Sequence, residues 1–189
     1  MSAIVNTMTN ENSTHFTTIT APDHPAMDDL VERLRGPANE MELAGIEAWP
    51  AQQLGACGQY GVYEWFLGSS VGGQQWSDAD LVEGYLRLSS ACLTTTFIIT
   101  QRTGACRRIA NGESDFCRDH WLPGLLTGEL FTTVGISHLT TSHRHLTKPV
   151  LRAEETADGF ILDGFSPWVT GAPFADVAVI GATLEDQRQ

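Results

Sequence analysis

The chain has 189 residues, of which 42% are hydrophobic and 18% charged, as expected for a globular protein of one domain or two small ones. Its formal net charge is −12 and Lys148 is the only lysine. Nucleic acids and anionic membranes are therefore poor candidate partners, because both are bound by neutralising phosphates. No apolar run approaches the roughly 20 residues of a membrane helix. With no signal peptide and no C-x-x-C spacing, we expect a cytoplasmic protein with reduced cysteines.

The beginning of the chain predicts a tail followed by short helices. Residues 1–24 are rich in Ser, Thr and Asn and show no period, which predicts a disordered tail. Acidic residues open the segment 28–36 and arginines close it before a glycine, as in a helix with a glycine C-cap. Further helices are expected over 39–48 and from Pro50, since proline is tolerated in a first turn.

Longer helices are predicted in the next part of the chain. Ser77 precedes two aspartates, which is typical of a helix N-cap. The helix is expected to bend near residues 94–96, where three threonines cluster, and another is expected over 113–126 with Gly128 ending it. The sequence therefore predicts an N-terminal helical domain over 25–128.

Residues 129–189 change character and predict strands, because Thr, Val, Ile and Phe occur in short runs between turn signals. Asp163–Gly164 between two apolar runs predicts a hairpin with a type I′ turn. The expected strands are 131–136, 149–154, 159–162, 165–170 and 176–181. We therefore predict the α+β class, an all-helical domain followed by an antiparallel β-barrel domain (129–189) that is incomplete.

The second strand of the predicted hairpin carries Trp168 and Thr170. Side chains alternate along a strand, so these two would point the same way. A flat ring and a hydroxyl on one face suit a flat polar ligand, although an ordinary half-buried strand has the same pattern.

In their order along the chain, three motifs resemble the acyl-CoA dehydrogenase family. They are Gly72–Gly73 before the helix pair 77–110, the Trp-Leu-Pro-Gly-Leu-Leu-Thr-Gly-Glu segment 121–129, and Asp163–Gly164 followed by Trp-Val-Thr-Gly at 168–171. The resemblance implies an N-terminal helical domain, a middle β-barrel domain and a C-terminal helical domain, with flavin adenine dinucleotide (FAD) between the last two.

The resemblance also implies cofactor-binding residues. Trp168 would pack near the isoalloxazine ring, and Thr170 would hydrogen-bond the flavin, with Val169 between them. The family's preceding loop supplies a flavin-contacting threonine about 30 residues earlier. Counting without gaps places His138 there, and a shift by one residue places Ser137 there.

The loop 137–145 departs from the family, because it lacks the expected glycines and proline. Ser142 and Arg144 are the candidate substrate-binding residues in this loop. The departure indicates a divergent branch of the family rather than a standard fatty-acid enzyme.

The implied activity is that of an oxidoreductase acting on CH–CH groups: α,β-oxidation of an acyl-CoA-type thioester, with electrons passed to FAD. The family's catalytic base is a carboxylate of the C-terminal domain, which the sequence does not contain, so no catalytic residue is assigned. We therefore expect a fragment, a truncated product or half of a split enzyme, as a homo-oligomer or with a partner chain supplying the C-terminal helices. The alternatives are a flavin-dependent monooxygenase of the same superfamily and a non-catalytic module that docks on such a partner.

Two further groups of residues are of types that bind metals or phosphates. His138, His143 and His145 with Asp163 contain metal-binding residue types, but no second motif fixes a geometry, and no metal is predicted. The pair Arg107–Arg108 could contact a phosphate, or could complement a helix C-terminus.

Overall fold

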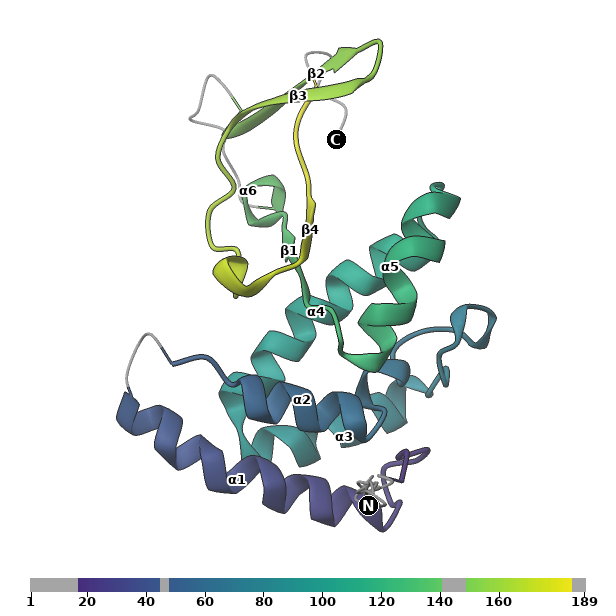
Figure 1. Cartoon of the computed structure of the whole chain (residues 1–189), viewed down its shortest axis with the longest axis vertical. Coiled ribbons are helices and arrows are strands. Elements are labelled where there is room, and N and C mark those ends of the chain that lie inside the picture. The colour runs from purple at the N-terminus through teal and green to yellow at the C-terminus, as the bar shows by residue number, and fades with distance from the viewer. Residues whose placement is uncertain (1–16, 45–47, 141–148, 185–189) are drawn as a thin grey trace, which may run out of the picture.

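The computed structural model describes residues 17–44, 48–140 and 149–184. Helices form the larger part of the molecule, and the strands stand on one side of it above α4 (Figure 1). None of the described helices is long and apolar enough to cross a bilayer. The helices are α1 (Ala26–Ala44), α2 (Ala51–Gln59), α3 (Asp78–Ala91), α4 (Leu93–Asn111), α5 (Asp115–Thr127) and the one-turn α6 (Ser137–Thr140), with 3-10 turns η1 (Val62–Glu64), η2 (Ser69–Val71) and η3 (Ala172–Phe174). The strands are β1 (Thr132–Gly135), β2 (Leu151–Thr156), β3 (Gly159–Gly164) and β4 (Val177–Ile180).

Part of the predicted N-terminal tail is built into the core. Ile19 is fully buried, and its backbone N–H donates to the Tyr60 carbonyl at 3.0 Å. Its carbonyl accepts a 3.0 Å hydrogen bond from the indole of Trp65. The prediction of disorder is therefore wrong for residues 17–24, because Ile19 and Pro22 are buried against the helices. Residues 1–16 lie outside the described residues.

The helical prediction is confirmed for α2, α3 and α5 but needs two corrections. One helix, α1, replaces the two predicted over 28–36 and 39–48, so Gly36 does not end it. The break between α3 and α4 lies at Cys92, whose extended backbone (φ −151°, ψ 101°) precedes the predicted bend at 94–96. Ser77 caps α3 as predicted, accepting from the Asp80 N–H at 3.2 Å.

Arg102 of α4 is the buried polar centre of the helical part. Its side chain is only 2% exposed, and its guanidinium lies 3.5 Å from the centre of the Tyr63 ring. It donates to the Leu125 carbonyl in the last turn of α5 and, at 3.5 Å, to the Leu130 carbonyl. One cation thereby satisfies a carbonyl that the end of α5 leaves without a helical partner and a second carbonyl in the segment that leads into β1.

The strands form two small sheets rather than the predicted antiparallel barrel. β2 and β3 are antiparallel, whereas β1 and β4 are parallel and pack on α4. The antiparallel prediction is wrong for this second pair because about 40 residues, including α6 and the hairpin, separate β1 from β4 and return the chain to the same end. After β4, Thr183 bridges to β2 at Arg152 and links the two sheets. No closed barrel is formed by the described strands.

The predicted hairpin of 159–162 with 165–170 is not formed, and the structure instead pairs β2 with β3 in an antiparallel hairpin. Ala157–Asp158 form the turn between β2 and β3, and Gly159 follows with positive φ (+143°). Asp163–Gly164 instead close the far end of β3. A Cβ at Gly164 would overlap the Val150 carbonyl, so this glycine permits a close approach of two backbones and does not form a turn.

All four cysteines are free thiols, and three of them are buried. Burial raises the pKa of Cys57 to about 12 and also raises the pKa of Cys106. At pH 8 a thiol of pKa 12 is ionised to about one part in ten thousand, and the thiolate is the reactive form. We expect Ellman's reagent to label the half-buried Cys117 alone in the native protein, and all four thiols in guanidinium. Rapid labelling of two or more native thiols would contradict this packing.

Candidate functional site

The candidate site is the irregular segment 165–171, which connects β3 to η3. The predicted strand over 165–170 is absent, so the alternation that placed Trp168 and Thr170 on one face does not apply. Trp168 has a positive φ of 55° and is 82% exposed. A left-handed backbone is unfavourable for a residue with a Cβ, and it persists only where the surroundings impose it.

The residues flanking Trp168 are held by β1 and α6. The Ser137 hydroxyl, in the first turn of α6, donates to the Pro167 carbonyl at 2.8 Å. On the other side, Val169 and Ser166 pack so closely on Gly135 that a Cβ there would lie 2.7 Å from the Ser166 hydroxyl and 3.0 Å from a Val169 methyl. The backbone is therefore fixed before and after Trp168, and its ring projects from a rigid support.

His138 lies inside this support. It is only 5% exposed, its Nε2 lies 2.8 Å from the Gly181 carbonyl, and its Nδ1 lies 3.5 Å from the Ser166 hydroxyl. A carbonyl only accepts, so Nε2 carries the proton and Nδ1 accepts from Ser166 in the neutral ring. The ring thus joins the end of β4 to the segment that carries Trp168.

Thr170 follows Trp168 two residues later in the chain. It is half-buried, and within the described part of the chain its hydroxyl has no hydrogen-bond partner. An exposed indole is a flat apolar surface on which a planar heteroaromatic ligand can stack.

The remaining sequence candidates do not add to this group. Ser142 and Arg144 lie outside the described residues, as do His143 and His145. Arg107 donates to the Phe66 carbonyl at 3.2 Å and Arg108 to the Gly104 carbonyl at 2.8 Å. Both arginines therefore hydrogen-bond backbone carbonyls within the helical part of the chain. No group of three potential metal ligands occurs among the described side chains.

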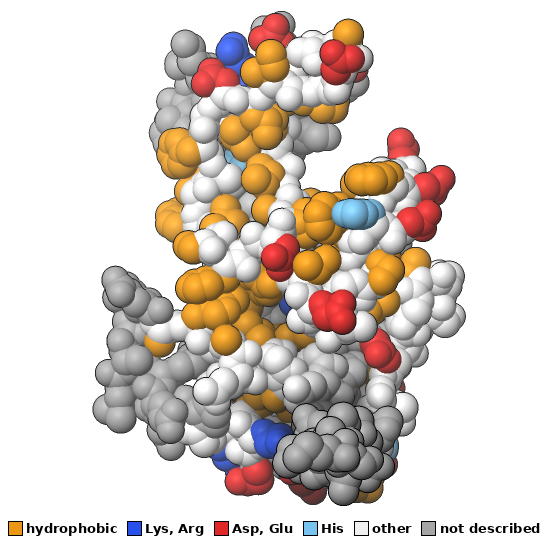
Figure 2. Space-filling model, viewed as in Figure 1, with side chains coloured by type: hydrophobic (Ala, Val, Ile, Leu, Met, Phe, Trp, Pro, Cys, Tyr) orange, Lys and Arg blue, Asp and Glu red, His pale blue; other side chains and the backbone are white. Residues whose placement is uncertain are grey.

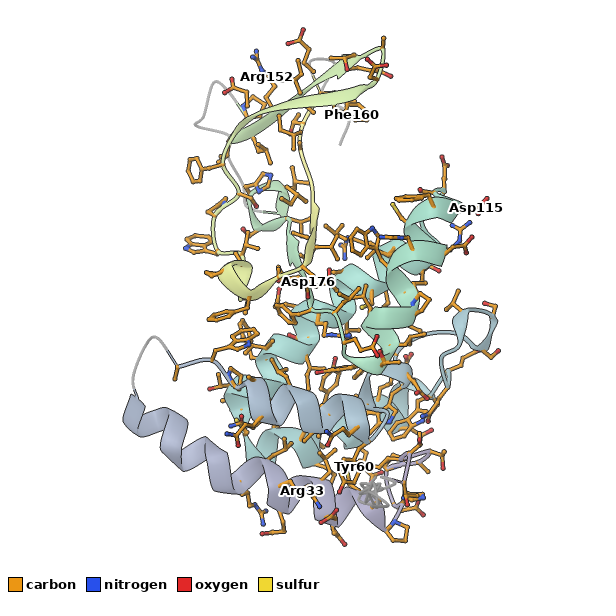
Figure 3. The ribbon with its side chains drawn as sticks, viewed as in Figure 1. Arg33, Tyr60, Asp115, Arg152, Phe160 and Asp176 are labelled. Carbon is orange, nitrogen blue, oxygen red and sulfur yellow. The ribbon has the colours of Figure 1, made fainter. Side chains whose placement is uncertain are left out.

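A ring cluster fastens the site segment to the helices. Trp49, just before α2, stacks on Phe174 with centroids 4.3 Å apart and meets Phe131 edge-on at 5.0 Å. Gly171 (φ +69°) lies against this cluster, since a Cβ would lie 2.7 Å from the Trp49 ring. Asp176 accepts from the Phe131 N–H at 2.8 Å at the same junction, where the β part meets the helices (Figure 3). Sequence reasoning missed this cluster, because about 120 residues separate Trp49 from Gly171.

The site segment belongs to a surface rich in exposed apolar side chains. Hydrophobic side chains gather over the β part and over its junction with the helices (Figure 2). Every residue of β3 is exposed. The large exposed apolar residues of the β part are Phe160, Ile161, Leu162, Phe165, Trp168, Phe174 and Ile180.

Similarity to known proteins lies in the fold. Family models and curated proteins give no match. Solved structures do match. An acyl-CoA dehydrogenase of Bacillus anthracis complexed with FAD has a TM-score of 0.69 and 18% identity over 86% of this chain and 28% of that one. The glutaryl-CoA dehydrogenase of Mycobacterium smegmatis has a TM-score of 0.63 and 21% identity over 85% of this chain and 43% of that one. The prolyl acyl carrier protein oxidase AnaB has a TM-score of 0.62 and 18% identity over 84% of this chain and 44% of that one.

This chain has the fold of the acyl-CoA dehydrogenases. The resemblance expected from the motifs is thereby confirmed at the level of the fold. The chain spans less than half the length of these structural neighbours.

Proposed function

We propose that the chain is a flavoprotein of the acyl-CoA dehydrogenase type that binds FAD against Trp168. One observation carries the proposal: an 82% exposed indole stands on a strained backbone whose neighbours are anchored on both sides. Strain of this kind is concentrated at ligand-binding positions, because elsewhere a residue without strain would serve. A neighbour of the same fold was solved with FAD, which supports the choice of ligand.

In this proposal the site residues position the flavin. The Trp168 indole covers one face of the isoalloxazine ring, and the Thr170 hydroxyl hydrogen-bonds its polar edge. Val169 and Ser137 hold the segment in place. His138 was a candidate for direct contact, but its buried ring favours a supporting role. When bound, FAD supplies the hydride acceptor for oxidation of an acyl thioester between its α and β carbons. We assign the proton-abstracting base to none of the described residues.

The proposal is tested by titrating purified protein with FAD and following flavin absorbance and fluorescence. We expect saturable binding that weakens by about fivefold or more in Trp168→Ala, because stacking of a base on an aromatic ring contributes about 1–3 kcal/mol. Phe160→Ala is the matched control, since Phe160 is exposed on the hairpin but lies away from the segment. Absence of binding, or equal affinity in Trp168→Ala, would overturn the proposal.

A second candidate is oxygen-dependent chemistry on the same flavin. AnaB, which shares the fold, is an oxidase acting on a prolyl acyl carrier protein. The sequence of the 137–145 loop, which lacks the family's glycines and proline, is also compatible with a flavin monooxygenase. Measuring oxygen consumption with an oxygen electrode distinguishes a dehydrogenase from an oxidase or monooxygenase. A dehydrogenase reduces an artificial electron acceptor with an acyl-CoA, whereas an oxidase or monooxygenase consumes oxygen with its substrate.

A third candidate is a non-catalytic module that docks on a helical partner. The exposure of β3 on both faces favours a partner for this part of the molecule. Gel filtration tests it: a stable, fully folded monomer that does not associate with a candidate helical polypeptide would contradict docking.

A further inference from the structure

We propose that His138 is a positioning residue that, together with Ser166, locks Trp168 in the conformation that receives the flavin. This inference rests on the proposed function and assigns His138 a role that acts through Trp168. It replaces the direct flavin contact that the family resemblance implied for this position.

The argument starts from the backbone of Trp168. An L-residue in the left-handed region is disfavoured by about 1–2 kcal/mol. Three restraints act on its neighbours: the Ser137 hydroxyl on the Pro167 carbonyl, the close packing of Val169 on Gly135, and the contact of Ser166 with His138. Without such restraints the segment would relax to a favourable φ, and the ring would point elsewhere.

His138 differs from the other restraints because it links two parts of the chain far apart in sequence. One ring nitrogen binds the Gly181 carbonyl beyond β4, and the other meets the Ser166 hydroxyl two residues before Trp168. The burial of the ring leaves it no edge for a ligand. The geometry therefore makes His138 a brace between β4 and the site segment.

The contact with Ser166 can be removed while the contact with Gly181 is kept. In His138→Gln the side-chain amide can still donate to the Gly181 carbonyl, but the nitrogen that accepts from Ser166 is lost. Ser166→Ala removes the same contact from the other side, and His138→Ala removes both. Phe160→Ala is the control, because Phe160 is exposed on the hairpin and contributes to none of the three restraints.

The test is a double-mutant cycle on FAD affinity. We expect His138→Gln and Ser166→Ala each to weaken FAD binding by about threefold or more, and the pair together to weaken it no further. In a Trp168→Ala background, His138→Gln should have no additional effect, because a positioning residue acts only through the ring it positions. A general structural role would instead lower affinity equally in both backgrounds, and that result would overturn the inference.

A second readout does not depend on FAD. The backbone amide of Trp168 should have an NMR order parameter near 0.85 in the unmodified protein, and it should fall below about 0.6 in His138→Ala and Ser166→Ala. Unchanged thermal unfolding and an unshifted Trp65 indole signal show that each variant is folded. If the unmodified protein fails to bind FAD, the proposed function fails while this measurement still tests the brace. An unchanged order parameter of the Trp168 amide in both variants would contradict the positioning role of His138.

Discussion

Replacing Arg102 by methionine is expected to lower the free energy of unfolding by about 2–4 kcal/mol. Methionine fills much of the space, but it leaves the Leu125 and Leu130 carbonyls without their buried donor. It also removes the cation over the Tyr63 ring, 3.5 Å from the ring centre. The loss combines unsatisfied acceptors with a lost aromatic contact, so it should exceed that of an ordinary surface arginine.

Denaturant unfolding followed by circular dichroism measures this difference. Arg152→Met is the matched control, since Arg152 is exposed and pairs with the exposed Asp163 at 3.4 Å. Surface pairs contribute at most about 1 kcal/mol, so this control should change stability little. Arg102→Lys should fall between the two, because an ammonium cannot reproduce the planar fork of the guanidinium. If Arg102→Met and Arg152→Met cost the same, Arg102 is not the centre of the helical core.

Gly171→Ala is expected to cost about 3 kcal/mol or more. The new Cβ would lie 2.7 Å from the Trp49 ring and 3.0 Å from Phe131, inside van der Waals contact, and the positive φ adds strain for any L-residue. The substitution should therefore loosen the junction between the site segment and the helices and weaken FAD binding with it.

A double mutant separates the clash from the strain. The double mutant Gly171→Ala, Trp49→Ala lacks the ring that the new methyl group would meet. Its loss in free energy of unfolding should therefore be smaller than the sum of the losses in the two single mutants. Gly36→Ala is the plain control: a Cβ there meets nothing within 4 Å, and in a helix it should be neutral or stabilising. Strict additivity of the two junction substitutions would contradict the packing described for Trp49.

Local signals in the sequence predicted much of the helical part. Ser77 and Gly128 act at helix ends as their residue types predict, because caps depend on a few neighbouring atoms. The prediction of the hairpin turn was wrong because it also relied on local signals alone. Both Asp158–Gly159 and Asp163–Gly164 carry the local turn signal. The pairing of β2 with β3 selects the first, and this pairing is tertiary.

The site was found from the sequence only in outline. The motif at 168–171 drew attention to Trp168 and Thr170, but nothing local predicts a tryptophan in a left-handed conformation. Its supports are Ser137, His138 and Gly135, which lie about 30 residues earlier and meet it only through the fold. The burial of His138 follows from contact with Gly181, a residue that no local pattern connects to it.

The most direct test of flavin binding at Trp168 is its indole N–H signal in a proton–nitrogen NMR spectrum, assigned with Trp168→Phe. On addition of FAD this signal should shift or broaden as the ring of the flavin stacks on it. The indole of Trp65, which is buried and bound to the Ile19 carbonyl, should stay in place. A spectrum in which FAD moves other signals and leaves that of Trp168 unchanged would contradict the site proposed here.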